Sequence, residues 1–217
     1  MDLLGPAAFA MAVAATPCPA PPQQAVKVVI SKSTPTLDLF RSGVELTAMN
    51  RSSFVPHGYE NGLTRGLTNS GIGVATRFGY SWTGNERRRD ACLWVTEVTI
   101  EITVRAAVYI DRQYPKGTCP YNAILEHELK HVRVNEETAE RAAPLLRAAV
   151  ERTVAASGAI GPFPIQSVSL AQERVSVPIR RTIDSVTATI VEEREQRQRA
   201  VDTPEEYRRV AAQCRGR

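Results

Sequence analysis

The amino-acid sequence predicts an α+β fold in which an antiparallel β-sheet comes first and helices follow. Between residues 71 and 110, apolar and polar residues alternate with a period of two, which is typical of half-buried strands. From residue 119 onward, the apolar residues gather in one sector when the chain is stepped by about 100° per residue, which is typical of a helix. The chain has 217 residues, 23% of them charged and 43% hydrophobic, enough for one globular domain.

Residues 1–15 are predicted to be a signal peptide. The segment is almost wholly apolar, too short to span a bilayer as a helix, and ends in small residues, as a signal-peptidase site requires. Its n-region is atypical, because it carries Asp2 and no Lys or Arg. A Pro-rich spacer is expected over 16–25 and a single domain over 26–217. These features predict a periplasmic or secreted bacterial protein without a transmembrane segment.

The strands are expected early in the domain. Short β-like runs occupy 25–31, 37–40 and 44–48, and a loop rich in Gly, Asn and Ser follows them. Two longer alternating runs, 71–82 and 92–110, most simply form an antiparallel hairpin. The second run exceeds ordinary strand length, so a bulge or bend is expected near 105–107.

The helices are expected after residue 118. Pro120 suits the first helical position, and Pro144 should kink or break the helix before it resumes to Ser157. A Pro/Gly connection then leads to a long polar helix over roughly 168–200, and a cap at 202–205 opens a short last helix.

The first of these helices carries the pattern H-E-x-x-H, formed by His127, Glu128 and His131. Two histidines four residues apart lie on one helix face, and each can place a nitrogen about 2.0–2.1 Å from one zinc ion. Glu128 lies roughly 100° around the helix from His127, where it can reach a water molecule held by the metal. This is the general-base geometry of zinc peptidases.

All three residues fall within the apolar arc of the helix. The opposite sector is charged, with Glu126–Lys130 and Arg133–Glu137 at salt-bridge spacing. A buried carboxylate beside two buried imidazoles is costly unless it is paired or bound to a metal. The competing interpretation is that the histidines are core residues with satisfied hydrogen bonds and that Glu128 pairs with an arginine. The complete pattern favours zinc.

The H-E-x-x-H helix next to a sheet resembles the zincin arrangement of zinc metallopeptidases. More narrowly, the segment 91–132 is similar to a bacterial family of uncharacterised, predicted secreted zinc-dependent proteases, in which a strand that begins with cysteine leads through a loop to this helix. The resemblance covers about 70–150, and 202–214 less specifically. It implies bound zinc, an exported location and peptidase activity.

A catalytic zinc takes three protein ligands and a water molecule. The metzincin continuation of the motif is absent, because Val134 and Glu137 stand where it needs Gly and His. A later helix that returns antiparallel would reach the level of the metal near 192–202. The candidates for the third ligand are therefore Glu192, Glu193, Glu195 and Asp202, with His57 as the alternative. Tyr121, Tyr207 and His57 are candidates for stabilising an oxyanion.

Four cysteines in an oxidising compartment suggest disulfides. The expected bond joins Cys92 to Cys119, so that it links the start of the hairpin to the start of the metal helix. Cys18 and Cys214 would form the second pair, unless Cys18 stays free in a flexible tail.

The sequence thus predicts an exported zinc-dependent metallopeptidase-like protein that hydrolyses amide bonds, with Glu128 as general base. Its substrate would be a peptide or protein, peptidoglycan peptide included, bound by β-addition to the strand that carries Thr99, Glu101 and Thr103. One alternative is a non-catalytic periplasmic zinc-binding or envelope-interaction module with a closed four-ligand site, and another is a metal-free scaffold held by disulfides. Nucleic acid is not an expected partner, because the basic residues are scattered without interleaved aromatics.

Overall fold

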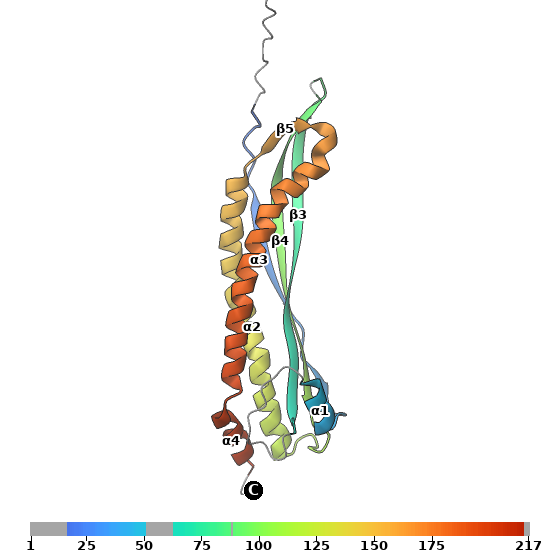
Figure 1. The fold of residues 1–217 in the computed structure, drawn as a ribbon, viewed down its shortest axis with the longest axis vertical. Helices are drawn as coiled ribbons and strands as arrows, with labels where there is room; N and C mark the ends of the chain where they lie inside the picture. The colour runs from blue at the N-terminus through green and yellow to red at the C-terminus, as the bar shows by residue number, and fades with distance from the viewer. Residues whose placement is uncertain (1–16, 51–62, 88, 215–217) are drawn as a thin grey trace, which may run out of the picture.

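The computed structural model describes residues 17–50, 63–87 and 89–214, and it confirms the α+β class. Two long helices run beside an elongated, twisted sheet (Figure 1). In chain order the elements are β1 (Ala25–Lys32), β2 (Thr36–Asp38), α1 (Gly43–Met49), β3 (Gly66–Asn85), β4 (Asp90–Ile110), α2 (Cys119–Ser157), β5 (Ile160–Pro164), the 3₁₀ turn η2 (Ile165–Ser167), α3 (Val168–Val201) and α4 (Pro204–Ala212).

The long strand β4 is the centre of the sheet. β3 pairs with it antiparallel over its whole length, which confirms the predicted hairpin. β1 and β2 pair with β4 in parallel and β5 pairs antiparallel, so the sheet is mixed and the expected purely antiparallel sheet was wrong. The physical reason is that side chains alternate with the same period in a strand of either direction, so the pattern carries no information on direction.

Both edges of β4 are occupied. β3 takes one edge, so β5, β1 and β2 must follow one another along the opposite edge. The expected β-addition of a peptide to β4 is therefore wrong, although Thr99, Glu101 and Thr103 do lie half-exposed between buried neighbours, on the face away from the core.

The segment 44–48, expected as a strand, lies in α1, where Ser42 and Glu45 form a capping box.

A β-bulge interrupts the hairpin, but not near 105–107, where the pairing is regular. The register shifts opposite Tyr80, which leaves Thr96 as an extra residue in β4. The extra residue reverses the alternation, so that Val95 and Val98, three residues apart, both belong to the core beneath the helices. The bulge therefore lets one long strand keep its apolar residues on one face.

The helices α2 and α3 form an antiparallel pair that covers this core. Of the expected kink or break at Pro144, the break is wrong, because α2 continues through the proline to Ser157, and buried Ala142 and Leu146 pack in the core on both sides of it. The chain reverses at β5, and α3 runs back until it ends at Val201. The last residues of α3 and the whole of α4 consequently lie at the same end of the molecule as the start of α2 (Figure 1).

Two disulfides join Cys18 to Cys92 and Cys119 to Cys214. The expected Cys92–Cys119 pair was wrong. Cys92 lies near the start of β4, whereas α2 starts beyond its end, so nearly the whole 21-residue strand, about 60 Å at ~3.3 Å per residue, separates Cys92 from Cys119. Two disulfides fit a secreted or periplasmic protein.

The N-terminal region is described only in part. The predicted signal peptide, 1–15, lies entirely within residues 1–16, outside the described part of the chain. The segment expected as a spacer is fastened to the sheet by the Cys18–Cys92 disulfide and by Gln24, whose side-chain amide donates to the Val95 carbonyl oxygen at 2.9 Å. Within the described ranges, no helix has the length and apolar character needed to cross a membrane.

Candidate metal centre

The H-E-x-x-H residues lie near the start of α2, on its buried side. His127 is 6% exposed and Glu128 4% exposed, which confirms their predicted place in the apolar arc.

The charged sector of α2 was predicted to face solvent with ion pairs inside the helix, and its ion pairs differ from that prediction. Glu126 and Lys130 form ion pairs not with each other but with Arg209 and Glu206 of α4. The side of α2 that was expected to face solvent therefore receives the C-terminal helix.

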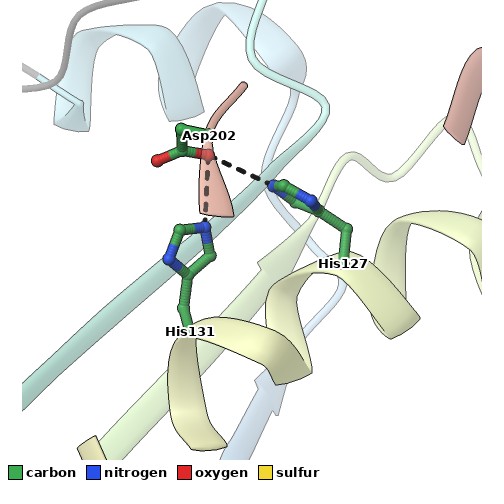
Figure 2. Close-up of side chains that lie close together, drawn as sticks. All are labelled: His127, His131 and Asp202. Atoms are coloured by element: carbon green, nitrogen blue, oxygen red, sulfur yellow. Dashed lines mark ion pairs between the residues drawn. The ribbon is translucent and has the colours of Figure 1, made fainter. Parts of the chain in front are cut away.

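The end of α3 brings a carboxylate to both histidines (Figure 2). Asp202 Oδ1 lies 3.3 Å from Nε2 of His127 and 3.3 Å from Nε2 of His131. Possible ligand atoms of the three residues all lie within 4.8 Å of one another. Ligand atoms around a tetrahedral ion bound at ~2.0–2.1 Å are about 3.3–3.4 Å apart, so the donor set and the two Asp202–histidine distances fit a zinc ion.

The other candidates for the third ligand are placed differently. Glu193 forms an ion pair with Arg141, and Glu195 forms one with Arg199. Glu192 is exposed on α3. None of these three glutamates belongs to the group around the histidines. His57 lies outside the described residues.

In both imidazole rings, the nitrogen that faces away from Asp202 has a polar partner that fixes the orientation of the ring. Nδ1 of His127 lies 3.3 Å from Glu206 Oε1, and Nδ1 of His131 lies 2.6 Å from Gln198 Oε1. The Gln198 amide is itself fixed, because its nitrogen donates to the His131 carbonyl oxygen at 3.0 Å. Since both partners are acceptors, each Nδ1 carries the proton, and in the neutral rings each Nε2 directs a lone pair at Asp202. Such a convergence of electron pairs is stable only around a proton or a metal cation.

The local electrostatics favour a positive charge at this point. In the absence of a metal, burial opposes ionisation of Asp202, but hydrogen bonds from Nε2 of the two histidines in their protonated form, and from Tyr207, outweigh burial and hold its pKa far below the ordinary value. Burial lowers the pKa of His131, yet its hydrogen bond with Asp202 and the nearby carboxylates raise it more, so the net shift is upward. The carboxylate therefore stays ionised, and its negative charge favours a cation, either a proton or a metal ion, between the three residues.

Glu128 sits beside this group in a tight enclosure. The Thr68 hydroxyl lies 2.8 Å from Glu128 Oε2. A Cβ atom on Gly66 would come within 2.4 Å of Glu128 Oε1, so only glycine leaves room for the carboxyl. Burial raises the pKa of Glu128 above its ordinary value, although the two histidines and the Thr68 hydrogen bond lower it in part. A carboxyl whose pKa is raised in this way is a better proton acceptor than an ordinary glutamate.

The two tyrosines proposed as oxyanion stabilisers lie in different surroundings. The Tyr207 hydroxyl donates to Asp202 Oδ1 at 2.7 Å, and its ring lies 5.5 Å from the His127 ring. Tyr121 is 3% exposed and packs in an apolar cluster with Val108 and Ile110. The structure thus brings Tyr207 to the site and places Tyr121 in the core.

The sequence interpretation missed four residues that support the site: Gly66 and Thr68 beside Glu128, and Gln198 and Glu206 behind the histidines. A partial signal for two of them exists. Gln198 lies four residues before Asp202, one helical turn away, and Glu206 follows the helix-capping Thr203 by three residues. Nothing local marks Gly66 or Thr68, because their role depends on the packing of β3 against α2.

Among protein-family models, curated proteins and solved structures, none matches this chain. The resemblance to zincins therefore stays a prediction, and the chemistry of the site rests on its own geometry.

Proposed function

We propose that this protein is a zinc-dependent hydrolase of the metallopeptidase type, in which His127, His131 and Asp202 hold one zinc ion. The observation that carries the proposal is the convergence of two Nε2 atoms on one carboxylate oxygen, at 3.3 Å each. The Nδ1 atom of each ring is held by a polar side chain. Two imidazoles and one carboxylate are an ordinary donor set for catalytic zinc.

Glu128 is the general base in this proposal. Zinc, when bound, supplies a Lewis acid for an amide carbonyl and lowers the pKa of a water molecule at the site. The Glu128 carboxyl, held by Thr68 and enclosed by Gly66, accepts a proton from that water molecule and returns it to the leaving amine. Its raised pKa suits both directions of transfer.

The substrate is an amide of a peptide or protein, peptidoglycan peptide included, and the protein works in the periplasm or outside the cell. Export is supported by the two disulfides and by the apolar N-terminal segment with its signal-peptide character. A pocket of about 360 Å³ lies between α2, the end of α3 and α4, and its lining includes Lys130, Thr203 and Glu206 but neither a candidate ligand nor Glu128.

A second candidate function is a zinc-binding module without turnover. It is favoured by the low exposure of the ligands, since the His127 and His131 side chains are only 7% and 12% exposed. A closed zinc site serves structure, whereas a catalytic site keeps one position open.

Zinc titration of the metal-stripped mature protein tests the ligands. We expect about one zinc per chain, because three converging donors define one site. His127→Ala and Asp202→Ala should each abolish stoichiometric binding, because two remaining ligands leave an incomplete site. Glu193→Ala is the matched control, since this glutamate lies on α3 but pairs with Arg141. Full zinc binding by the Asp202 variant would refute the ligand set.

Hydrolysis of a quenched-fluorescence peptide library separates the two candidate functions. Glu128→Gln should keep the zinc and lose hydrolysis by about 10²- to 10⁴-fold, the usual contribution of a general base. The module without turnover would be favoured if the wild-type protein binds zinc but hydrolyses no member of the library. The Glu128 variant would then show the same zinc binding and the same lack of hydrolysis.

A further inference from the structure

The C-terminal helix α4 is held in place mainly by polar contacts and one disulfide. None of its residues is buried, although Val210 is partly covered by the cluster that contains Val108 and Ile110. Its ion pairs with α2 are Lys130–Glu206 at 2.6 Å and Glu126–Arg209 at 3.2 Å. The exposed Glu126–Arg209 pair contributes little, whereas the Glu206 side chain is only 14% exposed. The covalent restraint on the C-terminal end of α4 is the disulfide from Cys214, just after α4, to Cys119, the first residue of α2.

The same helix supplies two contacts to the candidate ligands. Glu206 Oε1 faces Nδ1 of His127 at 3.3 Å, and the Tyr207 hydroxyl donates to Asp202 Oδ1 at 2.7 Å. The Glu206 carboxylate is fixed in turn by Lys130 and by Arg209, which donates to it at 2.8 Å. His131 differs, because its partner Gln198 belongs to α3. The orientation of one histidine thus depends on α4, while the orientation of the other does not.

We propose that α4 is a clasp, held by the Cys119–Cys214 disulfide, that orients the metal ligands, with Glu206 as the positioning residue for His127. The inference rests on the proposed metal site. It adds that the metal affinity of this site depends on a disulfide that contacts none of the ligands. The physical reason is that an acceptor on Nδ1 keeps Nε2 as the coordinating atom and fixes the plane of the ring. Without the disulfide, only ion pairs, the Tyr207–Asp202 hydrogen bond and the partial cover of Val210 keep that acceptor in place.

The chain offers a matched control for the disulfide. Cys18–Cys92 closes a loop of similar size, with a sequence separation of 74 against 95, but joins the far end of β4 to the N-terminal segment. Zinc affinity is measured by competition with a chromophoric chelator, and cobalt absorption reports the ligand geometry. The double variant Cys119→Ser/Cys214→Ser should bind zinc about 10- to 100-fold more weakly, the usual loss when support of a ligand is removed. Cys18→Ser/Cys92→Ser should bind as the wild type does.

Variants of Glu206 test the positioning role without touching a disulfide. Glu206→Ala should weaken zinc binding and shift the cobalt spectrum, whereas Glu206→Gln keeps an acceptor and should retain most of the affinity. Glu205→Ala is the control, because Glu205 is exposed and pairs with Arg208. Far-UV circular dichroism verifies that each variant is folded at the assay temperature.

Three results would overturn the clasp. The first is wild-type affinity in the Cys119/Cys214 variant, and the second is equal weakening in both disulfide variants, which would indicate a general loss of stability. The third is wild-type affinity and spectrum in Glu206→Ala, a test that stands even if the Cys119/Cys214 variant does not fold. A wild-type protein that binds no zinc would instead overturn the proposed function, and the clasp with it.

Discussion

At the scale of single residues, the site depends on how closely the sheet approaches Glu128. Gly66 of β3 lies against this glutamate and against Ile124, and a Cβ atom there would come within 2.4 Å of Oε1 and 2.5 Å of the Ile124 side chain. Thr68, two residues further along the same strand face, provides the hydroxyl next to the carboxyl. The beginning of β3 therefore forms one wall of the site and sets the position of the general base.

Gly66→Ala should lower peptide hydrolysis by about 100-fold, because the methyl group must displace Glu128, and misplacing a reacting group by about 1 Å has that effect. Zinc binding should be retained, since no ligand changes. Gly73→Ala in the same strand is the control, because a Cβ atom there meets nothing within 4 Å. Steady-state kinetics and zinc titration of both variants check the prediction, and equal rates in the two would contradict it.

At the scale of elements, a buried polar network sets the register of α3 along α2. Asn135 is fully buried, and its amide nitrogen donates to the Ser70 hydroxyl at 2.5 Å and to the His131 carbonyl oxygen at 3.1 Å. Arg194 of α3 donates to the Asn135 side chain and, at 2.9 Å, to the Ser70 carbonyl oxygen. This contact fixes α3 two turns before its end, so that Asp202 arrives beside the histidines.

Asn135→Ala should lower the free energy of unfolding by about 1–3 kcal/mol, because it removes one of the two acceptors of Arg194 and leaves the Nε–H of that guanidinium without its partner. It should also weaken zinc binding, because α3 loses its register against α2. Urea unfolding and zinc titration measure the two effects. Arg199→Ala, which removes an exposed pair with Glu195 on the same helix, should change stability by no more than about 0.5 kcal/mol. Unchanged stability in the Asn135 variant would argue against the network as the element that sets the register.

At the scale of the whole molecule, the two disulfides fasten opposite ends of a long structure. Cys18–Cys92 ties the N-terminal segment to the start of β4, and Cys119–Cys214 ties the C-terminus to the start of α2. The core between them consists of one face of the sheet and the inner sides of α2 and α3. Only the second disulfide lies at the end of the molecule that carries the candidate metal centre.

Peptide mapping under non-reducing conditions should link Cys18 to Cys92 and Cys119 to Cys214. Removal of the first bond by Cys18→Ser/Cys92→Ser should cost about 2–5 kcal/mol of stability, because the bond restricts the unfolded chain. Denaturant unfolding of the oxidised proteins measures this cost. A Cys92–Cys119 link in the map, or no loss of stability in the variant, would contradict the arrangement.

Local patterns in the sequence determined a large part of this protein. The α+β class, the long hairpin, the helix boundaries near 119 and 201 and the burial of His127 and Glu128 all follow from periodicity and from caps. The antiparallel return of a helix over 192–202 also followed, because rise per residue fixes how far a helix travels. Each of these features depends on residues that are close in sequence or on lengths that can be counted.

The tertiary structure decided which distant segments meet. It selected Asp202 from the carboxylates of 192–202 as the one beside the histidines, and it brought Glu206, Gln198 and Gly66 to the site. It also set the parallel pairing of β1 and the partners of the four cysteines. The reason is physical: periodicity defines which face of an element is buried, but strand direction, helix register and cysteine partners depend on where long elements lie against each other.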